Sequence, residues 1–294
     1  SLIAKHSHMK KILVPTDFSK EATIATDLGF DIAKKSGADL VLFHVVEEGS
    51  TSSSSFNVEG QVAAGAGRGI DSLFMIKLIE KSKKQLQKAV SDPRYSSVKV
   101  EGVMRVGNPY HGMRTVISEQ KADLVIMGTA GRSALGGMVI GSNTEKIIRT
   151  AHCPVLTVQK KPATNDFKNI VFATSMSSSE EVFIRILKRT QAIYGSTIHL
   201  VRVNTPGDFQ RDYIVKEYME KYAKKLQLRN YTLNIFNDLS VEEGVIRFAD
   251  MINADLISMA THGRSGFAHV IAGSVAEDVA SHASRPVLTF VVKR

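Results

Sequence analysis

Cysteine, tryptophan and long apolar runs are scarce or missing, and each absence excludes a class of protein. Cys153 is the one cysteine among 294 residues, which excludes a disulfide framework and a cysteine-based metal site and favours a reducing, cytoplasmic environment. The apolar runs, such as residues 40–46, fall far short of the about 20 residues that a membrane-spanning helix needs. Nine histidines are scattered without HExxH or another paired-ligand spacing. We therefore expect no membrane segment and no metal held by the protein alone.

The composition indicates ordinary globular cores under a basic surface. Hydrophobic residues make up 43% and charged residues 23% of the chain, values typical of soluble folded domains. The formal net charge of +9 is spread along the chain without a dense basic cluster beside aromatic residues, which argues against nucleic acid as a partner and favours small anions. Residues 1–8 have too short an apolar stretch for a secretory signal. We interpret them as a remnant of an expression vector, with Met9 as the native start.

The sequence repeats itself. Four segments of the first half recur in the second, two at an offset of 158 and two at an offset of 132: residues 10–17 in 168–175, 37–45 in 195–203, 122–127 in 254–259 and 154–157 in 286–289. We therefore predict two copies of one domain, residues 9–160 and 168–294, joined by a linker of residues 161–167. Because this linker is short, the copies should pack together. The first copy carries 26 additional residues, and the Ser- and Gly-rich residues 49–69 are typical of a surface loop.

Within each copy, short apolar runs alternate with amphipathic stretches. In the first copy the runs predict strands at residues 12–14, 41–43, 98–100, 124–127 and 155–158. Helical spacing predicts a helix after the cap candidate Ser19 and further helices at residues 71–90, 110–120 and 144–150. This alternation indicates an α/β fold of two tandem, doubly wound, parallel-sheet domains. In that architecture ligands bind beyond the carboxyl ends of the strands.

A glycine-rich loop follows the predicted strand at residues 124–127. Residues 128–142 contain five glycines, and Ser142 with Glu145 matches the S-x-x-E capping pattern, so a helix should begin there. Glycines let backbone N–H groups approach an anion, and a helix N-terminus adds unpaired donors. The loop is neither a GxxxxGK[ST] P-loop nor a GxGxxG fingerprint. Because turns also need glycine, the loop alone leaves a polyphosphate site and a purely structural turn both open.

The glycine spacing resembles a known family. Gly128-x2-Gly131-x9-Gly141-Ser142 is similar to the nucleotide-binding motif G-x2-G-x9-G-[ST] of the universal stress protein family. Residues 12–19 resemble the first strand of that family and residues 153–158 resemble its last. The resemblance implies a tandem universal stress protein with Rossmann-like, adenine nucleotide alpha hydrolase-like domains. It also implies that the last strands of the two copies pair across a two-fold axis as an intramolecular pseudo-dimer, while an exposed strand edge would allow a homodimer.

The same resemblance implies ATP or another adenine nucleotide in the first copy, with any Mg²⁺ carried by the phosphates. Asp17 would lie at the nucleoside end, and Val45, just after the second predicted strand, would line the adenine slot. The phosphate-binding positions would be Gly128, Gly131, Gly141 and Ser142. Arg132 either reaches a phosphate or is an exposed surface charge. Two residues depart from the family pattern, Asn143 in place of a small apolar residue and Ala130 in place of a histidine.

The second copy departs further. Ala260 replaces the first glycine and Ser175 replaces the residue corresponding to Asp17, although Gly263, Gly273 and Ser274 are kept. A Cβ at position 260 would crowd a phosphate or require torsions that alanine disfavours. We therefore expect a weaker second site, or a loop retained for folding alone.

The function implied is that of an ATP-binding, nucleotide-responsive protein of stress response or signalling, acting on an unidentified protein partner. Turnover is not favoured, because the loop offers donors but no evident base apart from Asp17. Two alternatives stay open: a nucleotide-independent interaction scaffold and a slow ATP hydrolase.

Overall fold

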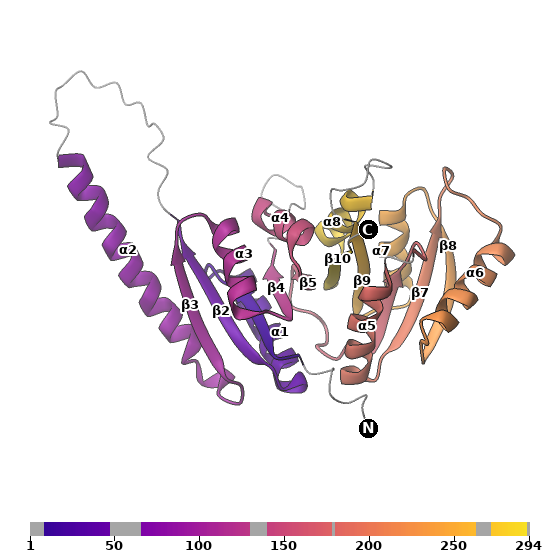
Figure 1. The fold of residues 1–294 in the computed structure, drawn as a ribbon, viewed down its shortest axis with the longest axis horizontal. Coiled ribbons are helices and arrows are strands. Elements are labelled where there is room, and N and C mark those ends of the chain that lie inside the picture. Colours follow the sequence, from indigo (N-terminus) through magenta and orange to yellow (C-terminus); the bar gives the residue numbers. More distant parts are fainter. Residues whose placement is uncertain (1–8, 48–65, 130–139, 178–179, 263–271, 293–294) are drawn as a thin grey trace, which may run out of the picture.

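The computed structural model describes residues 9–47, 66–129, 140–177, 180–262 and 272–292. Its strands form one continuous sheet in the order β3-β2-β1-β4-β5-β10-β9-β6-β7-β8 (Figure 1). Pairing is parallel within each half, and β5 and β10 are antiparallel where the halves meet. The α/β, doubly wound prediction is therefore confirmed for both halves.

In the first half the elements are β1 (Lys11–Pro15), α1 (Lys20–Ser36), β2 (Asp39–Val46), α2 (Ala66–Val90), the 3-10 turn η2 (Pro93–Tyr95), β3 (Val100–Val106), α3 (Pro109–Gln120), β4 (Leu124–Gly128), α4 (Ser142–Thr150) and β5 (Val155–Val158). In the second half they are β6 (Asn169–Ala173), α5 (Glu181–Tyr194), β7 (Thr197–Asn204), α6 (Asp212–Lys225), β8 (Tyr231–Asn237), α7 (Val241–Met251), β9 (Leu256–His262), α8 (Ala272–His282) and β10 (Val287–Val292). None of the described helices is long and apolar enough to cross a bilayer.

Three local predictions need correction. The loop expected at residues 49–69 is wrong for residues 66–69, which belong to α2, and its residues 49–65 lie outside the described part of the chain. The strand expected at residues 98–100 begins only at Val100, because the N–H of Val98 is bonded to the carbonyl of Tyr95 in the turn that precedes it. The capping pattern at Ser142 is also wrong. Gly141 is the N-cap and Ser142 is the first helical residue, while the Glu145 carboxylate accepts a hydrogen bond from Arg149 at 2.8 Å.

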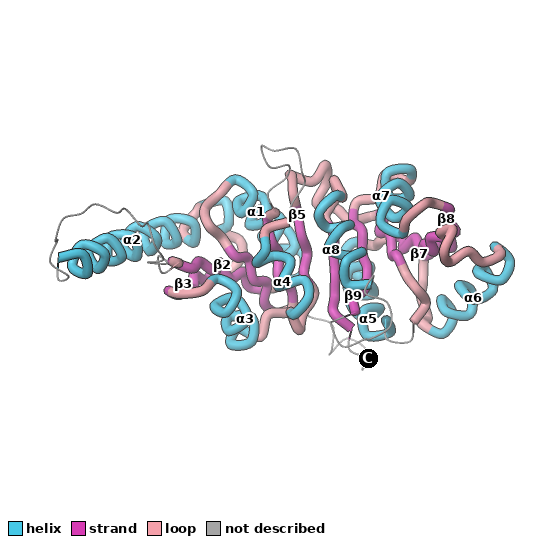
Figure 2. Tube along the Cα trace, turned by 90° about the horizontal axis from the view of Figure 1, so that it is seen from above, coloured by secondary structure: helices cyan, strands magenta, loops and turns pink. Residues whose placement is uncertain are grey.

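Helices cover both faces of the sheet. One buried cluster joins the inner sides of α1, α2, α5 and α6 to the sheet, and a second joins those of α3, α4, α7 and α8. Figure 2 shows these helices flanking the row of strands, with α2 extending away from one end of the molecule. The apolar spacing predicted for the first helix follows from this packing, because Ala25, Leu28 and Ile32 are among its buried residues.

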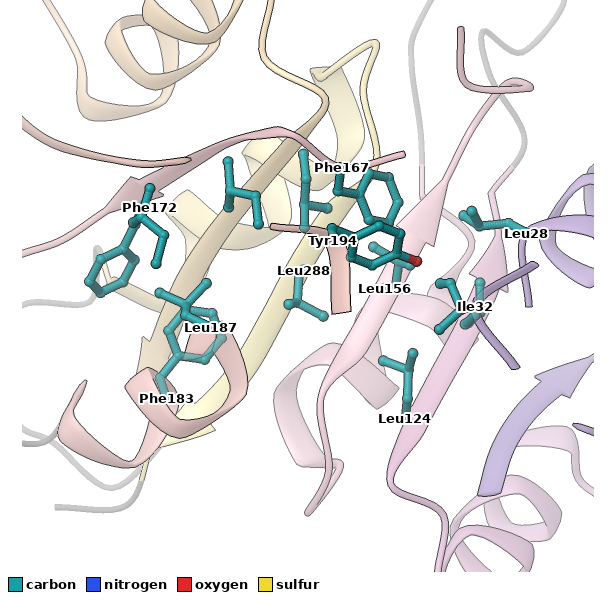
Figure 3. Close-up of a cluster of buried hydrophobic side chains, with 14 of the residues drawn as sticks. Leu28, Ile32, Leu124, Leu156, Phe167, Phe172, Phe183, Leu187, Tyr194 and Leu288 are labelled. Carbon is teal, nitrogen blue, oxygen red and sulfur yellow. The ribbon is translucent and has the colours of Figure 1, made fainter. Parts of the chain in front are cut away.

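The halves share a core across β5 and β10. Thr157 and Thr289 are related by the repeat, and each hydroxyl donates across the junction to a strand carbonyl at 3.3 Å. Figure 3 shows one apolar cluster running from Leu28 and Ile32 of the first half through Leu156 to Leu288 of the second. The predicted pseudo-dimer is therefore confirmed. Because β5 and β10 run in opposite directions, the strands of one half are antiparallel to those of the other across this junction.

Candidate functional site

A cavity of about 330 Å³ lies at the carboxyl ends of β1, β2 and β4. The strand order reverses between β1 and β4, and doubly wound sheets bind ligands at such a switch point. The walls come from the β1–α1 loop, the end of β2 and the first turns of α1, α3 and α4. Its volume falls within the range of small-molecule sites, about 300–1,000 Å³.

The β1–α1 loop is held by its own side chains. Asp17 Oδ1 accepts the N–H of Ser19 at 2.9 Å, and Ser19 Oγ accepts the N–H of Ala22 at 3.1 Å as the N-cap of α1. Between them Phe18 has a left-handed φ of +65°, which is rare for a bulky residue and costs about 1–2 kcal/mol. The loop thus holds the exposed Asp17 carboxylate in a fixed position at the cavity.

His44 supports this loop from behind. Its Nδ1 lies 2.7 Å from the carbonyl of Thr16 and its Nε2 lies 3.2 Å from the hydroxyl of Ser82 in α2. The ring also contacts Phe18, with centroids 4.5 Å apart. Nδ1 donates to the Thr16 carbonyl, because a carbonyl oxygen only accepts hydrogen bonds. His44 therefore links α2 to the strained turn at Phe18.

One wall of the cavity is apolar. It includes Phe43, Val45, Met113 and Met127, three of which belong to the buried cluster on the α3 side of the sheet. Val45 lies within β2, not just after it as the sequence suggested, and packs where α3 carries Gly112. A flat, weakly polar ring would replace water against this wall at little cost.

Gly128 is required by packing. A Cβ there would lie 2.3 Å from the carbonyl oxygen of Glu21 and 2.9 Å from the N–H nitrogen of Ala22, closer than real contacts allow. The absence of a side chain therefore lets the first turn of α1 approach the end of β4. Gly141 differs, because a Cβ there would meet nothing within 4 Å and its φ is −59°. Packing among the described residues does not explain that glycine.

The N-terminus of α4 borders the cavity through Asn143. The cap residue Gly141 provides no side-chain hydrogen bond, and the N–H of Glu145 is the first to bond back, at 3.1 Å to the Gly141 carbonyl. The N–H groups of Ser142, Asn143 and Thr144 precede this first intrahelical bond and so have no carbonyl partner within the helix. Such groups and the helix dipole favour an anion.

The described lining of this cavity is acidic. It includes Asp17, Glu21 and Glu47 but no lysine or arginine. A bare polyphosphate would be repelled by this charge, whereas one that carries a divalent cation would not. His44, Glu21 and Glu47 were not predicted as site residues. Spacing could not have identified them, because their place at the cavity follows from the register of β2 and the entry of α1.

The structure brings Asp17, Val45, Gly128 and Asn143 to this one cavity. Gly141 and Ser142 start the adjacent helix but do not line it. Gly131, Arg132, Ala130 and Gly263 lie outside the described residues. Gly273 and Ser274 are in the first turn of α8, as their counterparts are at the start of α4.

The second half has a different loop after its first strand. Ser175 corresponds to Asp17, and its backbone N–H and hydroxyl both bind Oε1 of Glu180, at 3.1 and 2.6 Å. Oε2 of Glu180 accepts hydrogen bonds from Thr174 and, at 3.1 Å, from Tyr222. Glu180 is only 3% exposed, so this carboxylate organises the loop from inside and does not face a ligand.

Ala260 fits its position without strain. It lies within β9, and its φ is not positive, so the expected torsional penalty is wrong. The helix after β6 starts at Glu181, three residues later than the repeat register with α1 would place it.

Comparisons with known proteins agree with this fold. The model of the "Universal stress protein family" matches residues 8–159 and again residues 166–291. Universal stress protein MJ0531 of Methanocaldococcus jannaschii is 34% identical over 151 residues, which cover 51% of this chain and 82% of the relative. Universal stress protein Slr1230 of Synechocystis is 25% identical over 295 residues, covering 96% of this chain and 100% of the relative. A solved universal stress protein from Archaeoglobus fulgidus superposes with a TM-score of 0.73 at 19% identity, over 97% of this chain and 99% of that one.

Proposed function

The chain belongs to the universal stress protein family, with one matching segment in each half, and on this premise we propose that the cavity of the first half binds ATP with Mg²⁺. The resemblance to a tandem member is confirmed, because a relative matches over nearly the whole chain. We further propose that bound nucleotide alters the surface around the cavity and so controls a protein partner in stress response or signalling.

The observation that carries the proposal is the meeting of three unlike surfaces in one cavity. The apolar wall at Val45 suits an adenine ring, and the Asp17 carboxylate is a strong acceptor for sugar hydroxyls. The start of α4, which borders the cavity through Asn143, suits phosphates. Gly131 and Arg132 remain proposed phosphate-binding residues on the motif alone. The domain limits, residues 9–160 and 168–294, and the weaker second site also remain proposals.

Charge distinguishes Mg²⁺-bound ATP from free ATP. With three carboxylates and no described cation in the lining, the phosphates need a counter-ion, which Mg²⁺ provides when it enters with the nucleotide. We expect the affinity for ATP to fall at least tenfold when Mg²⁺ is removed with EDTA. Equal affinity with and without Mg²⁺ would show that Arg132 or another residue neutralises the phosphates.

The test is calorimetric titration of Mg²⁺–ATP into nucleotide-free protein, beside Asp17→Asn. The asparagine keeps an oxygen for the Ser19 N–H, so the loop is preserved while the charged acceptor is lost. We expect one site per chain and a loss of about tenfold in the variant, since hydrogen bonds to charged groups contribute about 1.5–3 kcal/mol. Glu220→Gln, an exposed change on α6, is the control and should bind as wild type.

Other outcomes identify the alternatives. Two sites per chain would mean that the second half also binds nucleotide. No heat up to millimolar ATP would reject the proposal and favour a nucleotide-independent scaffold. Steady phosphate release that Asp17→Asn slows without weakening binding would identify a slow hydrolase, since a base at the cavity would then act in the reaction.

A further inference from the structure

A second cavity, of about 790 Å³, lies in the other half of the molecule. It is bounded by the β6–α5 loop, the β7–α6 loop and one side of α6, at the end of the sheet opposite to α2 (Figure 1). The helix contributes Ile214, Tyr218, Lys221, Tyr222 and Lys225, whose spacing of three and four residues places them on one face. Gly273 and Ser274, the described residues of the glycine motif in the second half, are not among its lining residues.

The lining combines positive charge with aromatic rings. Arg211, Lys221 and Lys225 are among the lining residues, and none of those residues is acidic. Phe209 and Tyr218 also line the cavity although they are 66% and 58% exposed. Exposed rings around a cavity indicate a surface that gains from contact with an apolar body. An anion is favoured by the cations, and arginine suits carboxylate and phosphate oxygens in particular.

Both walls of the cavity are fixed in place by hydrogen bonds. Arg202 pairs with Asp208, and Asn204 Nδ2 donates to the carbonyl of Gln210 at 3.1 Å, so the loop that carries Phe209 and Arg211 is anchored on either side. On the other wall the buried Glu180 binds Ser175 and Tyr222. A site whose walls are already ordered loses less entropy when a ligand binds.

The described residues of the first half are arranged differently at the positions that match this cavity. By the repeat register Met176, which lines the cavity, corresponds to Phe18, and Arg202 corresponds to His44. In the first half His44 contacts Phe18 and approaches Ser82 of α2, so it crosses the space between the loop and the helix. Arg202 turns instead to Asp208. At these two positions the second half has therefore diverged from the first.

We propose that this cavity is a second ligand site, which binds a small aromatic anion, a flat ring that carries a carboxylate or a phosphate. The ring lies against Phe209 and Tyr218, and the anionic group pairs with Arg211 and Lys221. Lys221 is now bonded to Glu217 at 2.6 Å, but both side chains are largely exposed, so exchanging this partner for a ligand anion costs little.

The test uses simple probes of that chemistry. 1-Naphthyl phosphate and 1-naphthoate supply ring and charge together, inorganic phosphate supplies charge alone, and 1-naphthalenemethanol supplies the ring alone. We expect calorimetry to show one site for the first two probes and at least tenfold weaker binding of the last two. The ratio between naphthyl phosphate and naphthoate identifies the preferred anionic group. Equal affinity for phosphate alone or for the neutral alcohol would overturn the proposal.

Substitutions of lining residues test whether the probe binds in this cavity. Arg211→Gln and Lys221→Gln should each weaken naphthyl phosphate about tenfold, and Tyr218→Ala should weaken it severalfold; all three side chains are exposed, so folding should be retained. Lys216→Gln, an exposed change on α6 outside the lining, should have no effect. An equal loss in Lys216→Gln would mean that net charge alone attracts the probe. Displacement of the probe by Mg²⁺–ATP, or its loss in Asp17→Asn, would place it in the first half. Either result would refute the proposal.

Discussion

Replacing Gly128 by alanine tests whether the fold needs a glycine at this position independently of any bound ligand. The new Cβ would lie 2.3 Å from the carbonyl oxygen of Glu21, whereas real Cβ contacts below 3.0 Å are essentially never found. The first turn of α1 would therefore have to move by about 0.7 Å. A shift of flexible side-chain atoms cannot relieve the contact, because both neighbouring groups are backbone.

The magnitude follows from what that turn carries. Overpacking of this kind costs about 1–3 kcal/mol, and disturbing the bond between Ser19 Oγ and the Ala22 N–H adds up to about 1 kcal/mol. At about 2–4 °C per kcal/mol for a domain of 150–250 residues, the melting temperature should fall by about 5–10 °C. ATP binding should weaken as well, because Ser19, Glu21 and Ala22 line the cavity.

Gly141→Ala is the matched control, measured by the same calorimetric melting and ATP titration. A Cβ at Gly141 meets nothing within 4 Å, so its melting temperature should stay within about 2 °C of wild type. If ligand phosphates need close approach at Gly141, binding falls in this variant without a loss of stability. A Gly128→Ala protein that melts and binds ATP as wild type does would refute the reasoning.

Two further predictions concern buried groups. Arg149→Gln should lower the free energy of unfolding by about 3 kcal/mol, because Arg149 of α4 pairs with Glu277 of α8, whose side chain is 8% exposed and would be left without its cation. Chemical denaturation checks this, with the more exposed partner Glu145→Gln expected to cost less than about 1 kcal/mol; equal effects would contradict it. Burial, and secondarily the charge of Asp123, raises the pKa of the Cys153 thiol to about 12. A disulfide reagent at pH 8 should therefore label the native protein at least a hundredfold more slowly than the unfolded protein, and equal labelling rates would show that the thiol is accessible.

Much of the fold could be predicted because the repeat and the apolar periodicity agree. The two offsets already indicated paired domains, and the final apolar strands, residues 155–158 and 287–292, meet as antiparallel neighbours. The start of β3 at Val100 could not be predicted from its apolar spacing, since the preceding residues continue the turn around Tyr95. The capping prediction at Ser142 failed for a similar reason. The Glu145 side chain accepts a hydrogen bond from Arg149, which also pairs with Glu277 of the other half. Glu277 comes close to Arg149 only in the folded protein, so the local sequence does not reveal this contact.

The motif residues of the candidate site could be predicted from the sequence, but the acidic charge of its cavity could not. Asp17 and Val45 were proposed from the resemblance to the family motif, and both lie at the cavity. Glu21 and Glu47 were missed, because nothing in their local sequence tells that the helix entry and the strand end bring two more carboxylates to the same space. For Gly128, in contrast, the motif suggested a ligand-binding role for a residue that packing alone explains. It belongs to a phosphate-binding pattern, yet contact with the backbone of Glu21 is enough to require it.

The two halves show how a repeated fold can build two different loops after its first strand. In the first half, the absence of a side chain at Gly128 lets α1 begin close to β4, and Asp17 stays exposed at the cavity. In the second half, the helix begins later, Ala260 is accommodated in β9, and Glu180 turns inward to bind the loop at Ser175. These changes depend on each other, because an inward carboxylate needs the donors of Ser175, Thr174 and Tyr222 to be stable when buried. Restoring aspartate at Ser175 alone would therefore place a second carboxylate beside Glu180, so a nucleotide site in the second half could not be recovered by that single change.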